Sequence, residues 1–382
     1  MTPRRYAVVA GGGTGGHVIP ALAVARALAA RGHDREAIEL VGSRRGHEAT
    51  LLEGEGFPFT NLPGRGMSRQ MGPGDLAANL GALVALAWST IRAVGALARW
   101  HPSVVVCVGG YASFPAGVAA VLLRVPLVVV NIDAVPGRVN RVLGRFASAS
   151  AVSFASTPLP RTVVTGTPVR DEILAVDPSP GGRARARVAL GFDEGRAVVG
   201  VFGGSLGARR INQAAAELAE RWAERSDRAI YQVTGRRDWA EVSARAGRSE
   251  VSGTQGQPSG LSRRLVPFEQ QMPVLYEAAD VMVCRAGAMT VAELTIAGVP
   301  SVLVPLPGAP GDHQTLNARV LVAAGAAVML PDDQCDGERL AAVLDELLAD
   351  PVRLASMARA ALGLSRRDAA ARVAEVVDAH AR

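Results

Sequence analysis

Short apolar runs alternate with alanine-rich segments of helical periodicity along most of the chain. The first apolar run, residues 6–10, passes through a glycine-rich turn into an apolar helical pattern that ends near Gly32. The same plan returns at residues 104–123, 197–222 and 281–307. Strand, turn and helix repeated in this order are typical of βα units on a parallel sheet. The pattern therefore predicts an α/β fold.

At 382 residues the chain exceeds the size of one ordinary hydrophobic core, so we predict two domains. Residues 162–173, and the segment rich in proline and glycine that follows them, separate the two series of βα units and have the composition of a hinge. We place the N-terminal domain at residues 1–166 and the C-terminal domain at 167–357. Residues 358–382 have the pattern of an amphipathic helix that packs on one of the two domains.

Composition narrows the class of protein. Hydrophobic residues make up 49% of the chain and charged residues 20%, which excludes a disordered protein. The net charge of +6 comes from 41 basic residues, all of them arginine, against 35 acidic residues. Arginine suits bidentate contact with phosphate, although exclusive use of arginine also follows from genome composition. We expect no nucleic-acid partner.

Cysteine usage and the N-terminus indicate a protein of the cytoplasm. Cys107, Cys284 and Cys335 lie far apart without a C-x-x-C pair, so we expect neither a metal site nor a disulfide framework. The first residues lack the apolar region and cleavage site of a signal peptide. No uninterrupted apolar run of about 20 residues is apparent, so we expect no transmembrane span.

The first glycine turn has the spacing Gly11-x-Gly13-x-x-Gly16, which suits a phosphate at the start of a helix. A dinucleotide enzyme also needs a carboxylate at the end of the second strand. Here that strand ends in residues 41–43, Val-Gly-Ser, with arginines beyond, so the acid is absent. A tight turn would explain the first two glycines but does not require His17. The sequence therefore favours a phosphate ligand other than a dinucleotide.

Five motifs, read together and in order, resemble the MurG family of peptidoglycan N-acetylglucosaminyltransferases, which convert lipid I to lipid II. They are residues 11–17, 109–111, 165–170, 203–208 and 284–293. The resemblance runs from about Val8 to the C-terminal helix. It implies a GT-B architecture, with two Rossmann-like domains facing across a cleft and the last helix returning to the N-terminal domain.

The resemblance also implies the reaction. The N-terminal domain would bind lipid I, and the C-terminal domain would bind UDP-N-acetylglucosamine (UDP-GlcNAc). The 4-hydroxyl of the acceptor sugar would displace UDP from the anomeric carbon in one inverting step, without a cofactor. No D-x-D motif occurs, which fits a reaction that uses helix dipoles and arginine in place of a metal.

The reaction needs a base for the acceptor hydroxyl, and the resemblance offers two candidates, His17 and Asp133. A nearby phosphate would raise the pKa of His17 and favour a binding role, and a histidine that merely begins a helix is the alternative. The implied acceptor site comprises Thr14, Gly15, Gly16, His17, Gly109, Gly110, Tyr111, Asp133 and Asn140. For the glycines, a role in the turn alone is the alternative.

The implied donor site comprises Arg170, Ser205, Phe268, Ala288, Met289, Thr290, Glu293, Gln314 and Asn317. Glu293 would accept both ribose hydroxyls, and backbone amides at residues 288–290 would face the diphosphate together with Ser205 and Arg170. Gln314 and Asn317 would bind the hexose, and Phe268 would flank the uracil. The alternatives are a solvated helix glutamate or a partner of the helix dipole for Glu293, and a helix cap or polar surface for the two amides.

Three positions depart from the family pattern. Residues 130–133 are Val-Asn-Ile-Asp where the family has His-Glu-Gln-Asn, Leu206 replaces a glutamine, and His313 replaces the first glutamine of a pair. Donor recognition is therefore better supported than acceptor identity. The rival hypotheses are a related transferase with another lipid-linked acceptor, a UDP-GlcNAc 2-epimerase, and a sugar-nucleotide-binding protein without activity.

A lipid-linked acceptor implies peripheral binding at the cytoplasmic face of the cell membrane, where other cell-wall synthesis proteins are expected as partners. Two segments combine apolar and basic residues suited to an anionic inner leaflet. The first holds Met67, Met71, Leu80, Leu83, Leu86 and Trp88 among Arg65, Arg69 and Arg92. The second holds Arg138, Arg141 and Arg145, which we expect on one helical stripe. A core with a solvated charged face is the alternative for each.

Overall fold

The computed structural model describes residues 4–12, 15–42, 54–62, 73–204, 207–246 and 260–382. The chain forms two compact units. Unit 1 contains Met1–Arg170 and Arg366–Arg382, and unit 2 contains Asp171–Ser365. The division after Arg170 lies close to the boundary expected at residue 166.

Unit 1 is built on a parallel sheet of seven strands in the order β3-β2-β1-β4-β5-β6-β7. The strands are β1 (Ala7–Gly11), β2 (Ile38–Gly42), β3 (Phe59–Asn61), β4 (Val104–Gly109), β5 (Leu127–Asn131), β6 (Ala149–Val152) and β7 (Thr162–Val164). The helices are α1 (Gly15–Ala30), α3 (Pro73–Trp100), α4 (Phe114–Leu122), α5 (Arg138–Leu143) and α16 (Ala369–His380). Short 3₁₀ turns η1 (Arg35–Ala37) and η2 (Tyr111–Ser113) precede β2 and α4.

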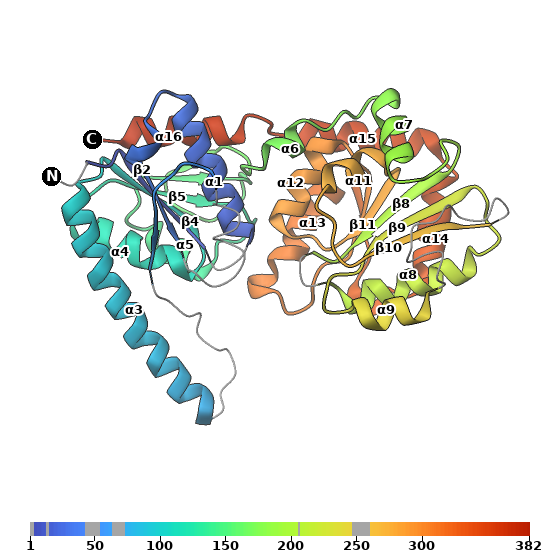
Figure 1. Cartoon of the computed structure of the whole chain (residues 1–382), viewed down its shortest axis with the longest axis horizontal. Helices are drawn as coiled ribbons and strands as arrows, with labels where there is room; N and C mark the ends of the chain where they lie inside the picture. The colour runs from blue at the N-terminus through green and yellow to red at the C-terminus, as the bar shows by residue number, and fades with distance from the viewer. Residues whose placement is uncertain (1–3, 13–14, 43–53, 63–72, 205–206, 247–259) are drawn as a thin grey trace. The chain divides into compact units, whose positions relative to one another are not determined.

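Every residue of β1, β4 and β5 is buried, as expected for parallel strands that are covered on both faces. Helix α4 packs on β4 and against α3 on one side of the sheet, whereas α1 and α16 pack together on the other (Figure 1). The strands are rich in valine, whose branched side chain suits a pleated surface. The apolar runs of the sequence therefore form the central strands β1, β4 and β5 of the sheet.

Unit 2 repeats the plan with a parallel sheet of six strands in the order β10-β9-β8-β11-β12-β13. The strands are β8 (Ala197–Phe202), β9 (Arg228–Val233), β10 (Ser262–Val266), β11 (Val281–Cys284), β12 (Ser301–Leu303) and β13 (Ala327–Met329). The helices are α6 (Asp171–Leu174), α7 (Pro180–Ala189), α8 (Arg209–Arg221), α9 (Trp239–Arg245), α11 (Met272–Ala278), α12 (Ala288–Ala297), α13 (His313–Ala323), α14 (Gly337–Leu348) and α15 (Pro351–Leu364). The 3₁₀ turns η3 (Pro310–Asp312) and η4 (Asp332–Gln334) precede α13 and α14.

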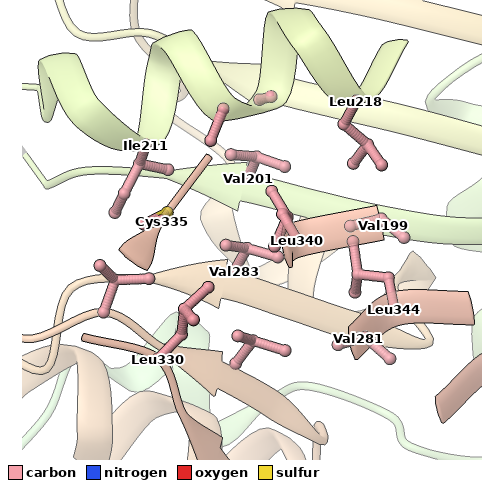
Figure 2. Close-up of a cluster of buried hydrophobic side chains, with 14 of the residues drawn as sticks. Val199, Val201, Ile211, Leu218, Val281, Val283, Leu330, Cys335, Leu340 and Leu344 are labelled. Carbon is pink, nitrogen blue, oxygen red and sulfur yellow. The ribbon is translucent and has the colours of Figure 1, made fainter. Parts of the chain in front are cut away.

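The core of unit 2 lies between β8, β11 and the helices α8 and α14 (Figure 2). Alternate residues of each strand point to this face, since side chains two apart in a strand share a side. The labelled members include Val199, Val201, Val281, Val283, Ile211, Leu218, Leu340 and Leu344, all fully buried. This packing fixes α8 over the sheet, so that its N-terminus is held beside the end of β8.

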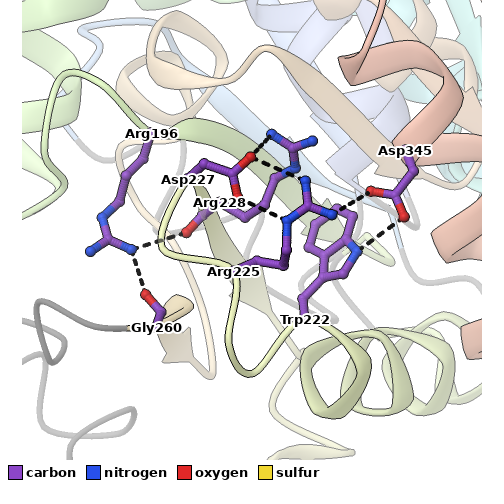
Figure 3. A network of polar contacts seen from close by, with 7 residues as sticks. All are labelled: Arg196, Trp222, Arg225, Asp227, Arg228, Gly260 and Asp345. Atoms are coloured by element: carbon purple, nitrogen blue, oxygen red, sulfur yellow. Dashed lines mark hydrogen bonds and ion pairs between the residues drawn. The ribbon is translucent and has the colours of Figure 1, made fainter.

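A network of polar contacts joins the strand beginnings in unit 2 to α14 (Figure 3). Arg225 Nε donates to Asp227 Oδ1 over 2.9 Å, and Arg225 Nη1 lies 3.6 Å from Asp345 Oδ1. Arg196 Nη1 donates to the Gly260 carbonyl over 2.7 Å. Arg225 is thus paired with two carboxylates at the amino-terminal edge of the sheet. The opposite, carboxyl edge is where a ligand of a parallel sheet binds.

The C-terminal segment is divided differently from the expected single helix at 358–382. Helix α15 ends at Leu364 and belongs to unit 2. Its residue Met357 is part of the hydrophobic core of unit 2, and its residue Leu362 packs on Gly298. The part grouped with unit 1 begins at Arg366 and contains α16, which packs on α1. The apolar periodicity of the two helices is continuous in sequence and so did not reveal the break.

Asp378 fastens α16 to the beginning of unit 1. Its carboxylate accepts a hydrogen bond from the Tyr6 hydroxyl over 2.6 Å and from Arg31 Nε over 2.5 Å. His33 Nε2 lies 3.0 Å from the same carboxylate, and its ring stacks on Tyr6 with centroids 3.6 Å apart. Burial favours a higher pKa for Asp378, but the hydrogen bonds from Tyr6, Arg31 and His33 outweigh it and hold the pKa below 3.8.

We predict that Asp378→Asn lowers the free energy of unfolding by about 2 kcal/mol at pH 7, because it weakens a charged, hydrogen-bonded anchor. The folded-state pKa is depressed, so the carboxylate stabilises the fold above its ordinary pKa of 3.8 and loses this effect as the pH falls below it. Urea titrations at pH 7 and pH 3 measure the difference. Glu375→Gln, at an exposed partner of Arg31, is the control. An equal gap at both pH values would contradict the assignment.

Candidate active site

The glycine turns of unit 1 lie where the strand order reverses. Strand β1 pairs with both β2 and β4, and the helices that follow β1 and β4 cover opposite faces of the sheet. In open α/β sheets, ligands bind at such a reversal, beyond the carboxyl ends of the two strands. The turn that begins at Gly11 and the turn at Gly109 and Gly110 both border that point. The repeated turns of the sequence therefore mark one edge of the sheet.

His17 packs directly on the second glycine turn of unit 1. It lies in the first turn of α1, and a Cβ atom on Gly109 would be 3.0 Å from its Cδ2. A Cβ atom on Gly110 would be 2.1 Å from the Gly12 carbonyl oxygen. Both turn glycines also have positive φ, 107° and 75°. Only glycine fits these two positions. Because neither residue has a Cβ atom, the imidazole of His17 can pack against the backbone of the turn.

A chain of amide hydrogen bonds fixes the loop that carries Asp133. The buried Asn140 donates from Nδ2 to the Val130 carbonyl and to Asn131 Oδ1, both over 3.1 Å. Asn131 in turn donates to the Asp133 carbonyl over 2.6 Å. Asn140 and Asp133 are residues that the sequence pattern indicates, whereas it indicates no role for Asn131. Its only signal was that it stands where the family has a glutamate.

The two candidate bases interact electrostatically. Burial lowers the pKa of His17 below 6.5, and the charge of Asp133 opposes this shift. The imidazole is therefore neutral near pH 7, as a base must be. Gly15 and Gly16 are the first residues of α1, Tyr111 begins η2, and Thr14 lies outside the described residues.

Unit 2 has the same reversal of strand order between β8 and β11. Helix α12 begins there with Ala288, Met289 and Thr290, the three residues expected to face a diphosphate. Its first turn contains no acidic residue, and Gly287 at the N-cap provides no side-chain cap. The helix therefore presents backbone amides suited to an anion. Ser205, in the turn after β8, lies in a part that the structure does not describe.

Glu293 is buried in α12, with 7% of its surface exposed. The hydroxyl of Tyr276 donates to Glu293 Oε2 over 2.8 Å. A solvated helix glutamate, the alternative raised by the sequence, is therefore excluded. Tyr276 was missed, since nothing in the local sequence indicates that a tyrosine on α11 meets a glutamate on α12.

Gln314 and Asn317, both predicted for the donor site, lie on α13 and hydrogen-bond to backbone groups of neighbouring loops. Gln314 Oε1 accepts a hydrogen bond from the Leu306 amide over 2.9 Å. Asn317 is fully buried, and its Nδ2 donates to the Ala286 carbonyl over 3.1 Å. The alternative of a polar surface face is therefore excluded for Asn317. Both side-chain amides therefore hold the loops that precede α12 and α13.

Two further donor residues have different surroundings. Phe268 follows β10 and is 45% exposed, with the guanidinium of Arg236 5.2 Å above its ring. Arg236 follows the neighbouring strand β9 and was not singled out from the sequence. Arg170 is the last residue of the first segment of unit 1, whereas the other residues predicted for the donor site belong to unit 2. Within the described parts of the chain, no group of three or more histidine, cysteine or acidic residues is placed to hold a metal ion.

Helix α3 carries the candidate membrane surface. Val84, Trp88 and Ile91 are exposed and share one face, whereas Ala93 and Leu97 are buried in the core beneath. By length and composition alone, Gly81–Trp100 is a candidate membrane span, although the sequence analysis expected none. Its packing on α4 makes it an outer helix of unit 1 (Figure 1).

The remaining residues of the two predicted membrane segments differ in their placement. Leu83 and Arg92 are exposed and Leu86 is half-buried. Arg65, Met67, Arg69, Met71 and the side chain of Leu80 are not among the described positions. Arg138, Arg141 and Arg145 are exposed, but α5 ends at Leu143, so the expected helical stripe of three arginines is wrong for Arg145.

Comparisons with known proteins agree over nearly the whole chain. Residues 7–152 match the glycosyltransferase family 28 N-terminal domain, and residues 198–373 match the family 28 C-terminal domain. A UDP-N-acetylglucosamine--N-acetylmuramyl-(pentapeptide) pyrophosphoryl-undecaprenol N-acetylglucosamine transferase of Alkalilimnicola ehrlichii is 41% identical over 370 residues, 97% of each chain.

Solved structures confirm the predicted fold class. MurG of Acinetobacter baumannii matches with a TM-score of 0.72 and 26% identity, covering 99% of this chain and 100% of that one. A UDP-GlcNAc 2-epimerase from Neisseria meningitidis matches with a TM-score of 0.62 and 14% identity, covering 98% and 100%. The epimerase shares the fold alone at that identity. The two parallel-sheet units have the GT-B fold, and the chain belongs to glycosyltransferase family 28 and, within it, to the MurG proteins.

Proposed function

We propose that the chain transfers N-acetylglucosamine from UDP-GlcNAc to the 4-hydroxyl of the N-acetylmuramic acid in lipid I, giving lipid II. The observation that carries this proposal is similarity at full length to a relative named for this transfer, 41% identical over 97% of both chains. A strand-order reversal bordered by glycine turns in each unit supports it, because two phosphate-bearing substrates need two such crevices.

The acceptor hydroxyl must lose a proton as its oxygen forms a bond to C1 of N-acetylglucosamine. We assign the proton to the imidazole of His17, which burial keeps neutral in the free protein. Asp133 then stabilises the imidazolium that forms, since its charge favours the protonated ring. The glycine turns with Tyr111, and Asn140 beneath the loop, hold the diphosphate end of the acceptor.

The bond from C1 to the β-phosphate oxygen breaks in the same step, and UDP leaves with its electron pair. Backbone amides at residues 288–290 and the helix dipole of α12 meet the negative charge of the leaving group, together with Arg170 and Ser205. Glu293 accepts the ribose hydroxyls, and Phe268 flanks the uracil. Gln314 contacts the hexose through its NH₂ group, and Asn317 fixes the loop before α12. No step requires a metal or cofactor.

We infer that the protein binds the cytoplasmic face of the membrane through the exposed face of α3, because lipid I is anchored there. Val84, Trp88 and Ile91 recur at helical spacing on that face. Arg138 and Arg141 are exposed on α5, and α4 packs against both helices. Apolar side chains beside arginines suit an anionic bilayer surface.

We predict that the wild-type protein transfers label from radioactive UDP-GlcNAc to a short-chain lipid I analogue. His17→Ala is expected to lower kcat at least about a hundredfold, the usual effect of losing a general base. His101→Asn, at an exposed histidine of unit 1, is the control and is expected to leave kcat unchanged. Unchanged kcat in His17→Ala with loss in Asp133→Asn would reverse the assignment of the base. UDP binding without transfer would mean another acceptor, or no activity.

We predict that Asp133→Asn shifts the acid limb of the profile of kcat/KM against pH to lower pH. In the wild type this limb lies below pH 6.5, because burial lowers the pKa of His17. Removing the Asp133 charge, which raises that pKa, lowers it further. Since kcat/KM reports the free enzyme, steady-state rates between pH 4.5 and 8 measure the shift. A limb that moves to higher pH would exclude this electrostatic pairing.

We predict that the double variant Trp88→Glu/Ile91→Glu binds vesicles containing phosphatidylglycerol at least about tenfold more weakly than the wild type. The two side chains lose apolar burial in the bilayer, and the new charges repel its surface. Cosedimentation measures the partition. Val188→Glu/Val352→Glu places the same two charges at apolar positions of unit 2 that are 63% and 78% exposed, and is the matched control. Equal loss in the control would count against a surface on α3.

A further inference from the structure

We propose that Tyr276 is a positioning residue for the donor, orienting the Glu293 carboxylate so that the site prefers a ribose to a 2′-deoxyribose. The inference rests on the proposed role of Glu293 as the acceptor of the ribose hydroxyls. Tyr276 does not itself touch the nucleotide in this proposal. It acts through the hydrogen bond of 2.8 Å between its hydroxyl and Glu293 Oε2.

The phenol of Tyr276 has a fixed position. Its side chain on α11 is 1% exposed, and its ring packs edge-on against Phe202 with centroids 6.1 Å apart at 72°. Phe202 is the last residue of β8 and is therefore part of the sheet itself. A hydroxyl on a ring clamped in this way cannot follow a moving carboxylate. The hydrogen bond therefore holds the Glu293 carboxylate in one position beside the phenol.

Glu293 lies near the end of β11 as well as on α12. Burial and the charge of Glu293 both raise the pKa of the Cys284 thiol, and Cys284 is the last residue of β11. Phe202 ends β8, the strand beside β11 in the sheet. The pair of Tyr276 and Glu293 thus lies at the reversal of strand order, where the sugar of a nucleotide binds in open α/β sheets.

The chemistry of a carboxylate explains why orientation matters. An ionised carboxyl group has about four acceptor sites, more than the phenol and the two ribose hydroxyls together require. The terminal torsion of a glutamate is broad, so a carboxylate without a fixed donor samples many orientations. Both hydroxyls are bound together only when the carboxylate plane faces the ribose. The buried phenol removes this freedom before the donor binds.

The test compares UDP with 2′-deoxy-UDP by isothermal titration of the full chain. We expect Tyr276→Phe to weaken UDP binding about tenfold, equivalent to about 1.4 kcal/mol. It should weaken binding of 2′-deoxy-UDP at least threefold less, so that the preference for ribose falls. Glu293→Gln should lose most of that preference. Adding Tyr276→Phe to Glu293→Gln should cause no further loss of UDP affinity, since the carboxylate that Tyr276 orients is already gone.

Tyr6→Phe is the matched control, because Tyr6 also donates to a carboxylate, that of Asp378, over 2.6 Å in unit 1. It is expected to lower the melting temperature and leave both affinities unchanged. Equal weakening of UDP and 2′-deoxy-UDP in Tyr276→Phe, or an additive loss in the double variant, would overturn the proposal and leave Tyr276 a structural residue. An intact ribose preference in Glu293→Gln would instead overturn the assigned role of Glu293.

Discussion

The first strand of each unit ends in a backbone turn so tight that a Cβ atom does not fit, and the helix that follows depends on this turn for its place. A Cβ atom on Gly11 would lie 2.8 Å from the His17 carbonyl oxygen, and one on Gly203 would lie 2.3 Å from the Ala208 amide nitrogen. The helix that follows each strand therefore returns directly over the strand end. In unit 1 this close return brings the backbone amides of α1, its helix dipole and His17 to the carboxyl end of the sheet.

Buried polar side chains beneath the turns hold this arrangement in place. Asn212, on α8, donates to the Thr234 carbonyl over 2.8 Å and to Asp238 Oδ2 over 3.1 Å. Asn140 and Tyr276 have the same kind of role, since each links two elements through a hydrogen bond. Because an unpaired buried polar group is costly, each link specifies one geometry of the loop above it. Hydrogen bonds from buried side chains thus fix the backbone around both candidate sites.

The fold was predictable because its signals are local. Apolar runs such as residues 104–109 and the glycine turns that follow them mark each βα unit within a few positions. The polar support was not predictable, since Tyr276 and Glu293 meet only through the packing of α11 and α12. Nor did the pattern show that Asn317 would be fully buried, because a polar residue on a helix is ordinarily exposed.

The altered loop at residues 130–133 distinguishes two ways in which a carboxylate can act. Here the position of the family's glutamate is Asn131, whose amide is committed to Asn140 and to the Asp133 carbonyl. The loop still presents one carboxylate, Asp133, whose charge reaches His17. Coulombic support falls off slowly with distance, whereas proton transfer requires a hydrogen bond of defined geometry. A carboxylate that stands two residues away from the family's position can therefore still support a charge, but it is less suited to accept a proton. This favours His17 as the base and Asp133 as its counter-charge.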